Sequence, residues 1–150
     1  MLWAALLVLI VVLVINSEPK RDANGQITKS GSLSVFDIRV NDCFDGVADG
    51  QTTREVTAKP CAQPHDAQMI EKLKQPGGGY PGEQSRFSTG GQKCQQDEQA
   101  RLSRSPLAQR LKIFILVPNQ QSWEDGNHTV ACAVVDQQGG KLTGPIDGTG

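Results

Sequence analysis

The chain has 150 residues, of which 15 are Lys or Arg and 16 are Asp or Glu, so its formal net charge is −1. It contains only four Phe, two Trp and one Tyr, and it has no run of basic residues. These features argue against nucleic-acid binding. The length suffices for one domain with a single core behind a terminal segment.

The chain opens with an apolar segment, Met1 to Ile15, in which every residue is nonpolar and neither Pro nor Gly interrupts a helix. Fifteen helical residues span roughly 22 Å, whereas a bilayer core is about 30 Å thick. Residues 16 and 17 extend the segment slightly. A cleaved secretory signal is the alternative, but no basic residue precedes the apolar stretch. We therefore expect an N-terminal membrane helix that anchors the chain through residues 1–17.

Four cysteines follow the anchor, and none of them belongs to a Cys-x-x-Cys pair, which makes them poorly suited to zinc. A small membrane-targeted domain with four spaced thiols is typical of an oxidising compartment and of two disulfides. The cysteines are Cys43, Cys61, Cys94 and Cys132. They predict a single-pass protein of the cell membrane with its domain on the extracytoplasmic side.

Two basic residues just after the anchor, Lys20 and Arg21, favour the opposite orientation under the positive-inside rule. We give the cysteines more weight than these two charges. The conflict would be resolved if cytoplasmic sequence precedes Met1 in the natural protein, and this is our expectation.

Residues 18–35 are rich in Ser, Asn, Gly and charge and show no apolar period, which predicts a flexible tether. The folded domain is then expected over residues 36–150. Its first strand is predicted at 36–41, where Phe36, Ile38 and Val40 alternate with polar residues.

A second strand is predicted at 54–59 from the same alternation. Residues 66–73 favour strand over helix and end before the Pro-Gly-Gly-Gly run at 76–79. Residues 83–104 predict one longer, largely exposed helix, although Gly90 and Gly91 weaken it.

The last third of the domain is expected to begin with a short helix over residues 105–111. Five consecutive apolar residues at 113–117 predict a central strand buried on both faces. Asn119 is suited to cap one or two helical turns that end at Gly126. A final strand is predicted at 129–135.

This order of elements predicts an α+β domain with a small, at least partly antiparallel sheet and the longer helix packed on it. Four cysteines allow three pairings. We favour Cys43 with Cys61, which flank strand ends across a short connection, and Cys94 with Cys132, which join helix to strand. In the chain-entropy description the two bridges would contribute roughly 3 and 4 kcal/mol.

Several segments carry a resemblance to a known family. They are Val40 to Phe44, Val56 to Cys61, Pro64 to Gln68, Cys94, Ser122-Trp123, Cys132 and Lys141 to Gly144. Together they resemble the septum-formation domain of actinobacterial membrane proteins, over residues 37–148. That family usually has Val-Gly-Asp-Cys in its first motif and His-Asp-Ala-Glu in its second. Asn41 and Gln68 depart from these patterns, and Gln68 weakens any role for a carboxylate at its position. The resemblance implies a membrane-attached, disulfide-containing envelope domain associated with septation, without known catalytic activity.

Few residues are candidates for chemistry. His65 and Asp66 would suit a general base, but neighbouring residues of a strand face opposite ways, and a hydrogen-bonded structural His65 is favoured. His128 is the only other histidine, and two histidines without an acidic cluster make a poor zinc site. No cofactor motif is present. Trp123 and Tyr80 are candidates for recognition, although a core position suits Trp123 better.

These observations lead to two functional hypotheses. The preferred one is a noncatalytic, membrane-anchored envelope domain that binds an envelope or division protein or a cell-wall polymer. The alternative is a hydrolase or metal-dependent enzyme centred on His65 and Asp66, which requires a third polar group such as His128 in the same cleft.

Overall fold

The computed structural model describes residues 17–47 and 54–146. Within these ranges no helix is long and apolar enough to cross a membrane. The predicted membrane helix falls almost entirely on residues 1–16, which lie outside the described part of the chain.

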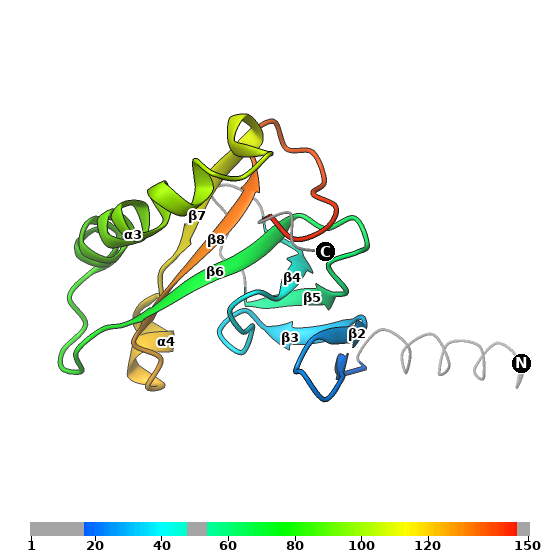
Figure 1. The fold of residues 1–150 in the computed structure, drawn as a ribbon. Helices are drawn as coiled ribbons and strands as arrows, with labels where there is room; N and C mark the ends of the chain where they lie inside the picture. The colour runs from blue at the N-terminus through cyan, green and yellow to red at the C-terminus, as the bar shows by residue number, and fades with distance from the viewer. Residues whose placement is uncertain (1–16, 48–53, 147–150) are drawn as a thin grey trace, which may run out of the picture.

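The fold is an antiparallel six-stranded sheet with one long helical segment and a small N-terminal hairpin (Figure 1). The strand order is β3-β5-β4-β6-β8-β7, and every pairing is antiparallel. The strands of this sheet are β3 (Gly31–Ser34), β4 (Cys43–Asp45), β5 (Glu55–Lys59), β6 (Ala67–Lys74), β7 (Leu111–Leu116) and β8 (Thr129–Asp136). The α+β class and the antiparallel sheet are therefore confirmed.

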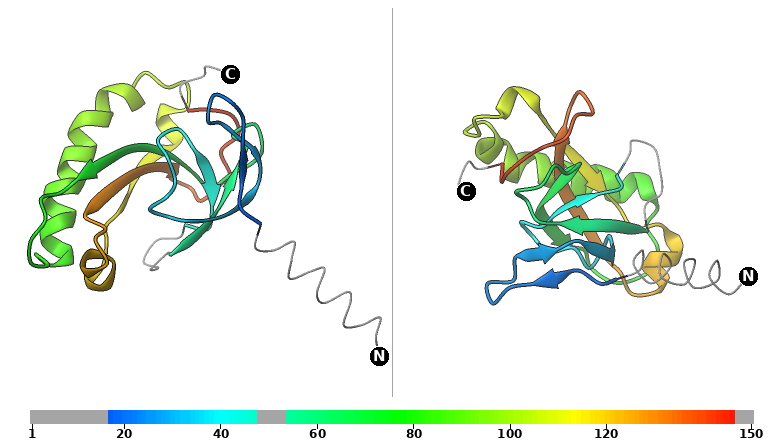
Figure 2. Two further views of the ribbon diagram at one scale, coloured as in Figure 1. Left: turned by 90° about the horizontal axis from the view of Figure 1, so that it is seen from below. Right: turned by 90° about the vertical axis from the view of Figure 1, so that its right-hand side faces the viewer.

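The helical segment consists of α2 (Glu83–Arg86), a π-helical stretch (Phe87–Gly91) and α3 (Gln92–Leu102). This confirms the long helix predicted at 83–104. The helix lies on one side of the β6-β8-β7 part of the sheet, away from the N-terminal strands (Figure 2). Its buried residues include Cys94, Glu98 and Leu102.

Strand β8 separates two hydrophobic clusters because its side chains alternate between the two faces of the sheet. Ala131, Ala133 and Val135 belong to the cluster with Phe44, Val56 and Met69. Val130, Cys132 and Val134 belong to the cluster beneath the helix, with Ile70 and Leu102. The strand predicted at 129–135 is thus confirmed, and it is the strand buried on both faces.

Strand β7, predicted to be central, is instead the last strand of the sheet. Its residues from Leu111 to Ile115 are only half-buried. The prediction failed because a continuous apolar run shows that both faces are covered to some degree, but not that strands pair along both edges. The expected helix at 105–111 is reduced to a 3₁₀ turn, Ala108–Arg110. Asn119 does cap α4 (Gln120–Glu124), since its Oδ1 accepts the Ser122 N–H at 2.9 Å.

The predicted flexible tether is wrong, because residues 18–35 contain β1 (Lys20–Arg21), β2 (Ile27–Lys29) and β3. A tight turn joins β1 to β2, in which Asp22 Oδ1 accepts the N–H groups of Asn24 and Gln26, both at 2.9 Å. Asp, Asn and Gly in this order form turns as readily as linkers. The folded domain therefore begins before residue 36.

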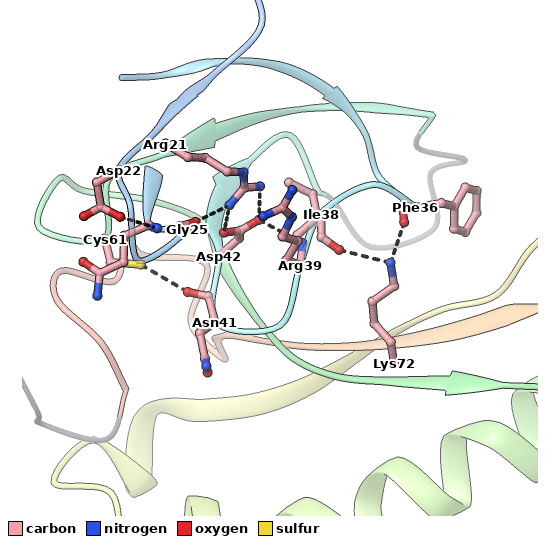
Figure 3. Close-up of polar contacts among 11 residues, drawn as sticks. Arg21, Asp22, Gly25, Phe36, Ile38, Arg39, Asn41, Asp42, Cys61 and Lys72 are labelled. Atoms are coloured by element: carbon pink, nitrogen blue, oxygen red, sulfur yellow. Dashed lines mark hydrogen bonds and ion pairs between the residues drawn. The ribbon is translucent and has the colours of Figure 1, made fainter. Parts of the chain in front are cut away.

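The strand predicted at 36–41 is also wrong, since residues 35–42 form turns and a loop. The apolar residues that the loop buries are Val35 and Ile38, three positions apart, whereas Val40 is 44% exposed. The carbonyl groups of Phe36 and Ile38 accept hydrogen bonds from the Lys72 ammonium (Figure 3). The Lys72 side chain thus supplies hydrogen bonds to these two carbonyl groups, which in a strand would come from a neighbouring strand.

Both predicted disulfides are confirmed. Cys43 is bonded to Cys61 across a Cα–Cα distance of 5.1 Å, and Cys94 is bonded to Cys132 across 6.0 Å. The first bridge ties the start of β4 to the end of β5, and the second fixes the helix to β8. All four cysteines are oxidised, as expected for a domain in an oxidising compartment.

The two glycines of the π-helical stretch allow the helix to approach the sheet closely. A Cβ on Gly90 would lie 2.7 to 2.9 Å from three side-chain atoms of Val130, while one on Gly91 would meet mainly the terminal Cδ1 of Ile115 at 2.8 Å. Val130 is fully buried in β8, whereas Ile115 lies in the edge strand.

We predict that Gly90→Ala lowers the free energy of unfolding by about 1 to 3 kcal/mol, because the new methyl group overpacks a β-branched neighbour that has no room to move. The matched variant Gly91→Ala should cost less, since the Ile115 end can rotate away and alanine favours a helix. Urea denaturation of both variants measures this difference. Equal losses of stability in the two variants would contradict the inference that Val130 leaves no room for a methyl group at position 90.

Candidate binding pocket

The loop before β4 adopts a conformation that few residues tolerate. Asn41 has a φ of 74°, and it is the only residue other than glycine with positive φ among those described. Its N–H donates to the Met69 carbonyl at 2.7 Å, which joins the loop to β6. Asn is, after Gly, the residue that adopts this conformation most readily.

Asp42 connects the loop to the N-terminal hairpin. Its two carboxylate oxygens accept hydrogen bonds from the two terminal nitrogens of Arg21, at 2.8 and 2.7 Å (Figure 3). Asp42 Oδ2 also accepts the Arg39 N–H at 2.8 Å, and Arg21 donates to the Gly25 carbonyl at 2.8 Å. Asp42 is only 6% exposed. A bidentate pair of this kind fixes both position and orientation.

The electrostatics of this pair favour its charged form. The hydrogen bonds from Arg21 to Asp42 raise the pKa of the Arg21 guanidinium above its ordinary value, although burial opposes the shift. In the sequence, Arg21 indicates only the orientation in the membrane. Its structural role depends on the fold, which places the guanidinium 2.7 Å from the carboxylate of Asp42, 21 residues further along the chain.

A pocket of about 630 Å³ lies beside this pair and beside the Cys43–Cys61 bridge. Three chain segments form most of its wall, residues 24–27, 40–43 and 59–62, and single residues complete it: Gln68, Arg101 and Pro145. Side-chain amides, two cations and the half-exposed Val40 line it, and no aromatic residue does. The pocket is therefore suited to a ligand that forms hydrogen bonds.

Gln68 is a buried wall residue with a structural partner. Its Oε1 accepts the Ile146 N–H at 3.0 Å, and the residue is 3% exposed. The bond holds the C-terminal segment against β6. A neutral amide oxygen performs this task as a carboxylate would, so Gln at this position keeps the contact without burying a charge.

Next to the pocket, two carboxylates and two lysines form a charged network. Asp45 pairs with Lys59 at 2.9 Å and with Lys141 at 3.0 Å, and Lys141 also pairs with Asp66 at 2.7 Å. Burial by itself would raise the pKa of Asp45, but the hydrogen bonds from the two lysines and from the Asp66 N–H lower it below its ordinary value. Asp66 is thus engaged in ion pairing and also accepts the Gly46 N–H at 3.0 Å.

His65 is fully buried beside this network. Its backbone forms a bridge with Leu142, and its Nδ1 lies 2.8 Å from the Gln63 carbonyl, which identifies Nδ1 as the protonated nitrogen. Burial lowers the pKa of His65 below its ordinary value. The imidazole is therefore neutral at pH 7, and its Nε2 has no hydrogen-bond partner.

His128 lies far from His65. Its backbone carbonyl accepts the Gln75 N–H just beyond the end of β6, whereas His65 precedes the start of that strand. Eight strand residues, or about 25 Å, separate the two positions. The third polar group that the enzyme hypothesis required is therefore not supplied by His128.

Trp123 and His128 belong to a separate cluster together with Tyr80 and Arg86, in which Trp123 and Arg86 are buried and the other two are half-buried. Trp123 is 4% exposed and donates its indole N–H to the Gly78 carbonyl at 2.8 Å. The ring centroids of Trp123 and His128 are 4.2 Å apart. Arg86 lies 4.2 Å from the centre of the Tyr80 ring and donates to the Tyr80 hydroxyl at 2.8 Å. The cluster secures the 76–82 loop against α4, and the indole ring is not available as a platform for a sugar.

One group of possible metal ligands occurs among the described residues, and it does not fit a metal. Glu71 lies within 4.8 Å of the sulfur atoms of Cys94 and Cys132. Both sulfurs are consumed by the disulfide and are not thiolates. Burial and the neighbouring Asp97 and Glu98 raise the pKa of Glu71. Glu71 and the Cys94–Cys132 disulfide are therefore part of the contact between the helix and the sheet.

Residues 16–132 match the septum formation family. The chain belongs to this family. No curated protein matches it, and no solved structure does. The match includes Arg21, the loop at 35–42 and the first disulfide, and so most of the wall of the pocket. In this family member, Asn41 occupies the left-handed conformation that the glycine of a Val-Gly-Asp-Cys motif would adopt without strain.

We predict that Asp42→Ala destabilises the domain by about 2 to 3 kcal/mol, because it removes a bidentate ion pair and leaves the Arg21 guanidinium without its carboxylate. Lys93→Ala, which removes the exposed Lys93–Asp97 pair, serves as the control and should change stability little. Thermal and urea denaturation measure both. An Asp42→Ala domain as stable as the wild type would show that the hairpin is held elsewhere.

We predict a second effect at His65. Its folded-state pKa is lowered, so between the unfolded value of about 6.5 and the folded value only the unfolded chain binds a proton, and stability falls as the pH drops through this window. His65→Ala should cost about 1 to 3 kcal/mol at neutral pH for the lost buried hydrogen bond. It should also reduce the fall in stability below pH 6.5. The free energy of unfolding of both proteins is measured from pH 7.5 to 5. If it changes equally with pH in the wild type and in His65→Ala, the lowered pKa is refuted.

Proposed function

We propose that this septum-formation domain is a noncatalytic binding module of the cell envelope, and that its pocket takes a peptide segment of a protein that acts in septation or envelope growth. The protein would be attached to the membrane through residues 1–17, with the domain on the extracytoplasmic side. The pocket of about 630 Å³ between the hairpin turn and the first disulfide carries this proposal.

Three properties of the pocket support a peptide ligand. Its amide side chains, Asn24, Gln26 and Asn41, offer both donors and acceptors, as a peptide backbone requires. The half-exposed Val40 supplies an apolar contact on the wall. The pocket also lacks the aromatic surface on which a sugar ring would stack, so a protein segment fits it better than a glycan.

The surroundings of His65 and Asp66 support a noncatalytic role. His65 is buried and neutral, and its Nδ1 is committed to the Gln63 carbonyl. Asp66 is paired with Lys141. A general base must reach the proton that it removes, and neither residue lines this pocket. Asp66 lines a smaller one of about 310 Å³, but its carboxylate is held there by Lys141.

The proposal is tested by blocking the pocket in cells that carry the variant as their only copy. Val40→Arg places a long charged side chain on the pocket wall. Phe87→Arg changes a residue of similar exposure, 50% against 44%, which does not line the pocket and lies at the opposite end of the helical segment from Arg101. We expect longer cells with misplaced septa for Val40→Arg and normal division for Phe87→Arg. Both purified proteins should melt like the wild type.

Normal division of the Val40→Arg cells would refute a role for the pocket in septation. A pull-down with purified cell-wall sacculi separates the two kinds of ligand. Wild-type protein that sediments with sacculi, and a Val40→Arg protein that does not, would replace the protein partner with the wall polymer. We expect no sedimentation of either.

A further inference from the structure

The two edges of the six-stranded sheet differ in how they are protected. At the β3 edge, the Ser32 N–H donates to the Ser17 carbonyl at 3.0 Å, and a Cβ on Gly31 would lie only 2.3 Å from the Pro19 nitrogen. The segment preceding the first strand therefore covers that edge. At the β7 edge, no other strand of the described chain pairs with the outer side of Leu111–Leu116.

The register identifies which backbone groups of β7 point outward. The Gln137 N–H donates to the Arg110 carbonyl at 2.7 Å, just before the point where Leu111 pairs with Asp136. Hydrogen-bonded pairs alternate along an antiparallel ladder, so Lys112, Phe114 and Leu116 bond to β8. The N–H and C=O groups of Ile113 and Ile115 therefore point to the open edge. At Leu111 only the C=O does so, because its N–H donates to the Ala108 carbonyl and closes the 3₁₀ turn.

The strand carries one of the usual edge protections, the charge of Lys112, but none lies at its three outward residues. Proteins block open edges with proline, bulges or inward-pointing charges. Leu111, Ile113 and Ile115 are aliphatic and half-buried, and the pairing of β7 with β8 is free of bulges. Their side chains all lie on the helix side of the sheet, against the cluster that contains Cys94 and Leu102.

We propose that β7 pairs antiparallel with β7 of a second copy of this chain, with Ile113 of each copy on a two-fold axis. In this register Ile113 pairs with Ile113 and Leu111 pairs with Ile115. The Ile113 pair exchanges two backbone hydrogen bonds, and each Leu111 carbonyl accepts the Ile115 N–H of the other copy. The two sheets become one continuous sheet through strand addition.

The side chains favour this register. On the helix face, the pairs are Leu with Ile and Ile with Ile, which are favourable cross-strand neighbours. On the other face, Lys112 of one copy lies opposite Phe114 of the other, so that the aliphatic stem of the lysine covers the ring and no like charges meet. An axis at Leu111 or Ile115 would pair only one outward residue within the strand, and an axis at Phe114 would leave Leu111 without a partner in the strand. An axis at Lys112 would place the two lysines opposite each other.

Amide hydrogen exchange tests the pairing on the full chain in detergent micelles, over a range of protein concentrations. We expect the amides of Ile113 and Ile115 to exchange fast in dilute protein and to become protected as a dimer forms in sedimentation analysis. The amides of Lys112, Phe114 and Leu116 should be protected throughout. A monomer at every concentration, or a dimer in which the two outward amides still exchange fast, would overturn the proposal.

A pair of variants provides a second test. Ile113→Pro removes an outward N–H but no hydrogen bond to β8, so edge-strand proline is compatible with the fold. We expect it to abolish the dimer, whereas Ile113→Val should keep it. If Ile113→Pro fails to fold, the exchange pattern of the wild type decides. Protection of the outward amides only after an envelope protein is added would overturn self-pairing in favour of a partner's strand.

Discussion

The fold depends on the burial of β8 on both faces. Its alternate residues enter two separate cores, with Ala131 and Ala133 on one side and Val130 and Val134 on the other. A one-residue slip of this strand would exchange the contents of both cores. The register is also fixed covalently, because Cys132 in the middle of β8 is bonded to Cys94 of the helix. The two glycines of the π-helical stretch then allow the helix to lie close to Val130 and Ile115.

The rest of the domain is held to this frame by a small number of polar contacts. The three-residue β4 pairs with both β5 and β6, and its first residue, Cys43, carries the other disulfide. Asp42, immediately before it, binds Arg21 and so fixes the N-terminal hairpin. The pocket exists where these constraints meet. Its walls come from three segments that are too short and too polar to form a core of their own, which explains why a disulfide and an ion pair border it.

The sequence predicted the part of the fold around β8 better than the N-terminal part that borders the pocket. Strands β5, β6 and β8, the long helix and the Asn119 cap followed from local periodicity and capping. The failures at residues 18–41 have two causes. Turn-forming residues and short strands give no long periodic signal over 18–34, whereas a short apolar alternation over 36–41 occurs in a loop. Among the site residues, His65 and Trp123 were singled out for their chemistry, but the fold buries both side chains. Arg21 and Lys72 were missed because their partners, Asp42 and the carbonyls of Phe36 and Ile38, lie 21 to 36 positions away.

By itself, the sequence determined the family and the α+β class, because motifs and periodicity are properties of the chain. It favoured one of three cysteine pairings, which the structure confirms. Only the tertiary structure decided which strand is central, which edge is open and which residues form a pocket. Strand order depends on contacts between distant segments, and the apolar pattern of β7 is the same whether one edge or both are paired. The tertiary structure also decided the positive φ of Asn41. The loop takes this conformation where the Asn41 N–H donates to the Met69 carbonyl of β6.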